Sequence, residues 1–129
     1  MRTITFRGLR VDGGGWAFGH LVPRIHRRKK QWWIVENIHY GALQGHQVNP
    51  ETVGQFTGIS DKKGHAVYEG DIVKTRVSRP NAKKNPKYRN FQVVYNGSSF
   101  WNTFDSLLLQ PYLIEVVGNV YEHPNLLGV

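Results

Sequence analysis

Cysteine and long apolar runs are both missing from this sequence. Without cysteine, disulfides, thiol catalysis, iron–sulfur clusters and cysteine zinc sites are excluded. No apolar run approaches the roughly 18–20 residues that a bilayer-spanning helix needs. Residues 1–7 also lack the apolar stretch of a secretion signal. We therefore expect a soluble, cytoplasmic protein with no membrane partner.

Acidic residues are scarce, with 9 Asp and Glu against 17 Lys and Arg in 129 residues, a formal net charge of +8. Residues 1–89 hold all 17 basic and six acidic residues, or +11, whereas residues 90–129 hold three acids, or −3. Two clusters dominate, at residues 24–30 and 74–89. Burying so many unpaired cations costs several kcal/mol each, so we expect them to be solvated or to face an anionic partner.

Recognisable catalytic motifs are also missing. None of the six histidines belongs to an H-E-x-x-H pair, no glycine-rich phosphate loop is present, and no serine lies in a G-x-S-x-G turn. Asp61, Glu69 and Asp71 are candidates for an acid–base or metal pair. Turn formation explains them with fewer assumptions, since short acidic side chains accept hydrogen bonds from turn amides. We expect no metal, no cofactor and no enzymatic activity.

Strand patterns occupy most of the chain. Alternation at residues 3–7 predicts a first strand, and glycines at 13–15 predict a hairpin into a second strand that Pro23 ends. Residues 31–35 predict a third strand with Trp32 and Trp33 on opposite faces. Residues 40–48 are glycine-rich and predict a loop, followed by a helical turn at 49–52.

The second half predicts further strands at 53–57, 65–68, 72–77, 91–95 and 114–120. Two prolines and five cations predict a long hairpin arm over 78–90. Residues 99–110 leave a short helix open, and residues 121–127 a terminal coil or helical turn. The expected core is Ile4, Phe6, Phe56, Val67, Val73, Phe91, Val93, Ile114 and Val116.

The predicted fold is mainly β: a single compact domain over residues 1–129, with long hairpin arms and at most one or two short helices. The turn at 69–73 resembles the entry to a barrel strand in SH3-like barrels, so an SH3-like barrel core is expected by analogy.

The order of motifs at 5–12, 15–19, 48–64, 67–74 and 115–127 resembles the YopX family of phage and prophage proteins. The match runs nearly end to end and is most specific in the middle. It implies a β-rich fold and an origin in a phage or integrated element within a bacterial host. Both basic clusters lie in the weakly matching stretches, so their role does not come from the family.

Cations interleaved with aromatic residues suggest a binding module, since phosphates pair with Lys or Arg while bases stack on rings. Trp33 and Tyr88 are the expected stacking residues. The candidate residues for contacting nucleic acid or an acidic partner are Arg24, Arg27, Arg28, Lys29, Lys30, Trp33, Lys83, Lys84, Lys87, Tyr88 and Arg89. We expect the two clusters to converge on one surface that binds DNA or RNA mainly through phosphates, serving phage gene control or replication. The alternative is a module that binds an acidic host or phage protein, or assembles with itself.

Overall fold

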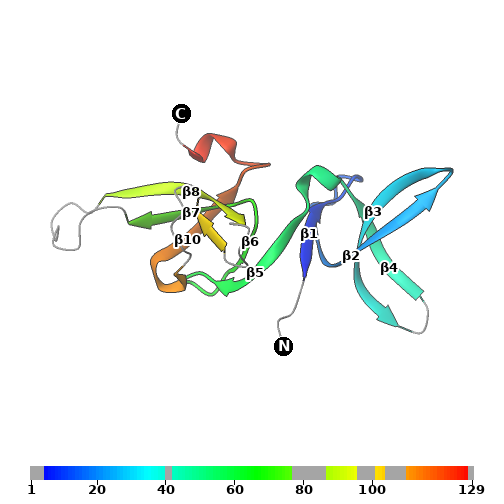
Figure 1. Ribbon diagram of the computed structural model, residues 1–129, viewed down its shortest axis with the longest axis horizontal. Helices are drawn as coiled ribbons and strands as arrows, with labels where there is room; N and C mark the ends of the chain where they lie inside the picture. The colour runs from blue at the N-terminus through cyan, green and yellow to red at the C-terminus, as the bar shows by residue number, and fades with distance from the viewer. Residues whose placement is uncertain (1–4, 40–41, 77–86, 96–100, 104–109, 128–129) are drawn as a thin grey trace. The chain divides into compact units, whose positions relative to one another are not determined.

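The structure is a computed structural model that describes residues 5–39, 42–76, 87–95, 101–103 and 110–127. It groups into two units, Met1–Phe56 and Thr57–Val129, and each is described by itself. The mainly β class is confirmed, because the described residues form ten strands and three short 3-10 helices (Figure 1). The SH3-like barrel and the single domain over 1–129 stay predictions.

Unit 1 is an antiparallel sheet built from β1 (Phe6–Leu9), β2 (Trp16–His26), β3 (Lys29–His39), β4 (Ala42–Val48) and the start of β5 (Gly54–Ser60), in the order β4-β3-β2-β1-β5. A bridge between Arg10 and Val48, and a hydrogen bond from the Asn49 N–H to the Leu9 carbonyl, join the end of β4 to the end of β1. The sheet therefore curls back on itself. Its core consists of Ala17, Ile34 and Val48, with Phe6, Leu21, Trp32 and Val53 packed against them.

Unit 2 contains the later residues of β5, β6 (Ala66–Tyr68) beside them, and a four-stranded sheet. The sheet has the order β10-β7-β8-β9, from β7 (Asp71–Arg76), β8 (Tyr88–Tyr95), β9 (Trp101–Thr103) and β10 (Ile114–Asn119). Val67, Val73, Val93 and Ile114 form its core, with Ile59 and Val116 against them. Ile114 and Val116 of β10 both face this core because alternate side chains of a strand lie on one face.

The 3-10 helices are η1 (Pro50–Thr52), η2 (Pro111–Leu113) and η3 (Pro124–Leu127). Asn49 caps η1 by accepting a hydrogen bond from the Glu51 N–H at 3.1 Å, which confirms the helical turn predicted there. The helical turn left open after residue 120 corresponds to η3. Of residues 99–110, the structure describes β9 and Gln110, and the predicted helix otherwise lies outside the described residues.

The expected core is confirmed at most of its positions. Val67, Val73, Phe91, Val93 and Ile114 are buried, and Phe6 and Val116 pack against the two cores. Phe56 is partly buried, and Ile4 lies outside the described residues.

Two local predictions are wrong. Residues 42–48 of the predicted loop form β4, and Gly45 is there because a Cβ at this position would lie 2.7 Å from the Ile34 carbonyl oxygen. Pro23 does not end the second strand, which continues to His26. Beyond Gly19, β2 has a strand partner on one side alone among the described residues, and proline is tolerated on such an edge because a missing N–H there breaks no ladder bond.

Candidate functional site

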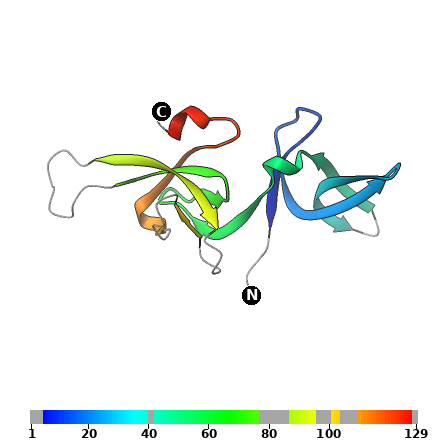
Figure 2. The ribbon, with the colours of Figure 1, turned by 45° about the horizontal axis from the view of Figure 1, so that its top comes forward.

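The first basic cluster lies on the β2–β3 hairpin, at the end farthest from the core of unit 1. Arg24 pairs with Gln31, Ile25 with Lys30 and His26 with Lys29. Strand β4 pairs with β3 from Trp32 onward, and β1 pairs with β2 no further than Gly19. Within the described parts of the chain, residues 24–31 therefore form a two-stranded segment without a third strand, which we call the ribbon tip. Figures 1 and 2 both show it extending past β1 and β4 of its own unit.

The turn of the ribbon tip is made by two arginines. Arg27 and Arg28 have φ angles of 51° and 66°, and they are the non-glycine residues with positive φ among those described. Positive φ at both central residues is typical of the type I′ turn, whose twist matches that of the flanking strands. Asn-Gly is the favoured pair there, and each ordinary L-residue in this region costs about 1–2 kcal/mol. The tip keeps two arginines at positions where glycine or asparagine is more stable.

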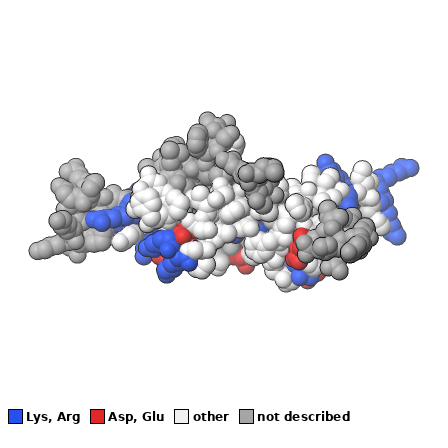
Figure 3. Space-filling model, turned by 90° about the horizontal axis from the view of Figure 1, so that it is seen from below, with Lys and Arg blue, Asp and Glu red and all other residues white. Residues whose placement is uncertain are grey.

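The cations of the ribbon tip have no carboxylate partner within the described residues. Arg27, Arg28, Lys29 and Lys30 are exposed and Arg24 is half-buried. The sequence contains no acid between Asp12 and Glu36. Described ion pairs of unit 1 involve Arg10 and Asp12, away from this tip. The tip is the end rich in lysine and arginine at the right of Figure 3.

The two tryptophans of β3 lie on opposite faces, as predicted, and each carries a cation. Trp32 packs on the core of unit 1, and the Lys30 ammonium lies 4.6 Å from its ring centre. Trp33 lies on the other face with the Arg24 guanidinium 4.5 Å from its ring centre. The Trp33 indole N–H donates to Gln31 Oε1 at 3.1 Å. Both rings thus have a cation over one face, and base stacking on Trp33 stays a prediction.

The second basic cluster lies in unit 2, where Lys87, Tyr88 and Arg89 are exposed at the start of β8. The Lys74 ammonium lies 5.0 Å from the ring centre of Tyr88, across the β7–β8 pair. Lys83 and Lys84, with most of the predicted hairpin arm, lie outside the described residues. Convergence of the two clusters on one surface stays a prediction.

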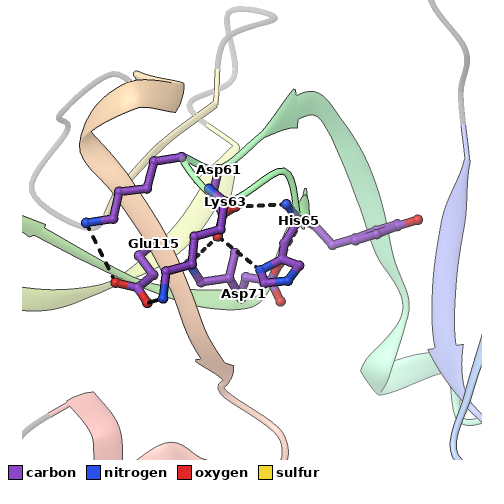
Figure 4. A network of polar contacts seen from close by, with 8 residues as sticks. Asp61, Lys63, His65, Asp71 and Glu115 are labelled. Carbon is purple, nitrogen blue, oxygen red and sulfur yellow. Dashed lines mark hydrogen bonds and ion pairs between the residues drawn. The ribbon is translucent and has the colours of Figure 1, made fainter.

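Asp61 organises the turn at 61–65 in unit 2 (Figure 4). Its side chain is fully buried, and Oδ1 accepts from the N–H groups of Lys63 at 2.9 Å and His65 at 2.8 Å. Oδ2 accepts from the Val116 N–H of β10 at 2.9 Å and lies 3.5 Å from the His65 ring. Burial raises the pKa of Asp61, but the three N–H donors and His65 together hold the pKa below its usual value. The carboxylate therefore joins the turn to β10.

The cations of this turn have an acidic partner. The Lys63 Nζ lies 2.7 Å from Oε1 of Glu115 on β10, and the Lys62 Nζ lies 3.7 Å from Oε2 of the same carboxylate. The hydrogen bond from Lys63, followed by the charges of Lys63, Lys62 and Lys74, lowers the pKa of Glu115. The same contact raises the pKa of Lys63. These lysines neutralise a carboxylate of their own unit.

Turn formation also explains Asp71, the third acid considered from sequence. It is 1% exposed, and its Oδ2 accepts from the Tyr68 N–H at 2.8 Å. Gly70 between them has a φ of 92°. The interpretation of Asp61 and Asp71 as turn residues is confirmed by these hydrogen bonds.

Sequence reasoning missed Ile25, which is 80% exposed within the ribbon tip. The alternation of side chains along a strand could have identified it. In a strand that continues through Pro23, the side chain of residue 25 lies on the face opposite to Arg24 and His26. The misplaced strand end at Pro23 hid this alternation.

The described ranges lack two features. They contain no group of three or more His, Asp or Glu side chains placed to hold a metal ion. They also contain no helix with the length and apolarity to cross a membrane.

These features define a mainly β protein with a cationic two-stranded ribbon tip. The family described as YopX protein matches residues 5–128, so the chain belongs to the YopX family, which confirms the resemblance found in its motifs. A crystal structure of protein EF1440 from Enterococcus faecalis has a similar fold, with a TM-score of 0.58 and 18% sequence identity over 98% of this chain and 99% of that one. No curated protein matches the sequence significantly.

Proposed function

We propose that this protein binds nucleic acid through phosphate contacts made by the ribbon tip. The observation that carries the proposal is the set of cations at residues 24–30, which have no carboxylate partner within the described residues. Nucleic acid supplies closely spaced anionic charge, and its release of counterions drives the binding of such surfaces.

The strained turn supports the same proposal. Arg27 and Arg28 occupy left-handed conformations that a glycine or asparagine would adopt at lower cost. Backbone strain persists where the side chain gains something elsewhere, and a contact outside the chain supplies that gain for two exposed guanidinium groups. Arginine also matches phosphate geometry, because its planar fork donates two parallel hydrogen bonds.

The arrangement favours weak sequence preference. Base readout requires side chains placed against base edges, whereas phosphate contacts fix position without reading sequence. Gln31, the one amide of the ribbon tip, accepts the Trp33 indole hydrogen bond. We assign Arg24 and Trp33 to a preformed pair that holds one guanidinium in place. Lys87, Tyr88 and Arg89 of unit 2, with Lys83 and Lys84, form a second proposed contact.

Salt titration of the full chain against duplex and single-stranded DNA tests the proposal. If about four phosphates are neutralised, log K falls with log salt at a slope near −3.6, which is roughly a hundredfold loss between 50 and 200 mM. Absence of binding to both at about 50 mM salt would overturn it.

A polyglutamate of matched charge is the control for an acidic protein partner. If polyglutamate and DNA bind with equal affinity and equal salt slope, the proposed partner would be an acidic protein and not nucleic acid. Light scattering across the same salt range tests self-assembly, and binding accompanied by a constant monomer mass supports the proposal.

A further inference from the structure

Ile25 is the most exposed large apolar side chain among the described residues, at 80%, and it lies inside the cationic ribbon tip. Its position is two residues before the turn, or about 7 Å along the strand. A single exposed isoleucine needs no explanation by itself. Here it has cations before it, after it and across from it, at Arg24, Arg27 and Lys30.

The surroundings leave Ile25 uncovered. Its cross-strand neighbour Lys30 has its ammonium 4.6 Å from the Trp32 ring centre. Trp32 lies two residues further from the turn than Lys30, so the lysine side chain runs away from the turn and toward the core. Pro23, on the same face as Ile25, is also exposed. This face of the tip is an apolar projection between cations.

The chemistry of the tip selects among forms of nucleic acid. Proteins that bind single strands present aromatic rings on which bases stack. Both tryptophans of β3 lie outside the ribbon tip, nearer the core, and carry Arg24 or Lys30 over one face, while the projecting side chain of the tip is aliphatic. Aliphatic side chains between cations are instead typical of proteins that bind the minor groove. These proteins insert such side chains between base pairs and thereby kink the duplex.

We propose that the ribbon tip enters the minor groove of duplex DNA and that Ile25 wedges between two adjacent base pairs, bending the duplex. This inference rests on the proposed function and adds the form of nucleic acid and the deformation. Arg27, Arg28 and Lys29 hold the phosphates beside the wedge, and the bend brings further phosphates toward the ribbon. Pyrimidine–purine steps unstack most easily, so the protein favours duplexes with a TA or CA step at the contact.

The test measures energy transfer between dyes at the two ends of a duplex of about 30 base pairs, a length over which bends of 40–90° are accessible. Wild-type protein is expected to bend it by roughly 20–90°. I25S is expected to bind with the same salt slope, at an affinity lower by about tenfold or less because the phosphate contacts remain, and to leave the duplex nearly straight. I25L, which keeps an aliphatic side chain, is expected to restore the bend.

V11S is the matched control, since Val11 is also a β-branched residue of unit 1 and is 55% exposed. It is expected to bend DNA as the wild type does. Both replaced side chains are exposed, so circular dichroism and thermal unfolding should be unchanged.

Failures of the two proposals give different results. Absence of binding overturns the proposed function itself. Binding to a straight duplex, a bend that I25S retains, or tighter binding to single strands than to duplex overturns the wedge and leaves the phosphate contacts standing.

Discussion

The ribbon tip of unit 1 and the turn at 61–65 of unit 2 are both rich in lysine or arginine, but they differ in what the charge faces. At the turn, Lys62 and Lys63 lie beside Glu115, and Asp61 accepts three backbone hydrogen bonds. At the ribbon tip no carboxylate lies beside the cations within the described residues. The lysines of the turn are paired with a carboxylate of their own unit, whereas the cations of the ribbon tip are those that we propose bind a partner.

Charge counted along a sequence therefore does not identify a binding surface. Both regions contribute to the formal net charge of +8. Surface ion pairs such as those of Glu115 contribute little to folding, yet they reduce the charge available to a ligand. The two regions differ in whether a carboxylate lies beside each cation, and the sequence does not show this.

The largest expected effect comes from removing the carboxylate that organises the turn. D61A leaves three N–H donors without their acceptor and should lower the free energy of unfolding by about 3–5 kcal/mol. Urea unfolding followed by tryptophan fluorescence and circular dichroism measures it. D12A in unit 1 is the control, because Asp12 also accepts a turn hydrogen bond, from Gly14, but is exposed. Equal losses in both variants would show that burial of Asp61 does not matter.

Removing charge from the ribbon tip should affect binding rather than stability. The fourfold variant R27Q/R28Q/K29Q/K30Q is expected to lose about a hundredfold in DNA affinity, or about 2.7 kcal/mol, with a much shallower salt slope. K62Q/K63Q, which removes two charges, is the control, and for each charge removed we expect a smaller loss of affinity because both lysines lie beside Glu115. Equal losses in the two variants would remove the distinction between the regions.

Much of the fold followed from local pattern. Alternation placed the strands around Phe6 and Val73, strand-forming residues placed the one around Val93, and Asn49 and Pro50 predicted η1. The strand β4 was missed because Gly45 signals a loop in sequence, whereas in the structure it permits close approach to the Ile34 carbonyl. The sequence alone does not distinguish a glycine in a loop from a glycine that permits close contact between strands. The residue opposite it in the sheet decides which of the two applies.

The site was predictable in composition and not in geometry. The cluster at 24–30 was evident, but its turn was not, since Arg27-Arg28 lacks the Asn or Gly that marks a type I′ turn. Pro23 suggested a strand end because nothing local shows that β2 there has an open edge. Ile25 consequently received no role. The turn, the strand end and the exposed isoleucine all depend on how β2 pairs with its neighbours, which local sequence does not show.

The strained turn offers a way to separate stability from binding. R27N/R28G supplies the favoured residues for two positive φ angles and should stabilise unit 1 by about 1–2 kcal/mol. The same variant should bind DNA more weakly, because two guanidinium groups are lost. R27K/R28K keeps both charge and strain, so stability and the salt slope should change little, while affinity should fall modestly because lysine lacks the planar fork of arginine. A less stable R27N/R28G variant would mean that the arginine side chains support the hairpin, against the strain argument.

The smallest effect concerns the pH dependence of unit 2. The folded state holds the pKa of Asp61 below its usual value near 3.8, so folding favours the ionised carboxylate. Its contribution to stability is therefore complete above that usual value and is lost as pH falls through the lower pKa of the folded state. D61N has no such group, so the stability difference between wild type and D61N should shrink as pH falls from about 5 to about 2. Asp12 and Glu115 titrate in both proteins, and their effects cancel in the difference. Urea midpoints at each pH measure it, and a difference that stays constant over this range would mean that hydrogen bonding to Asp61, without its charge, holds the turn against β10.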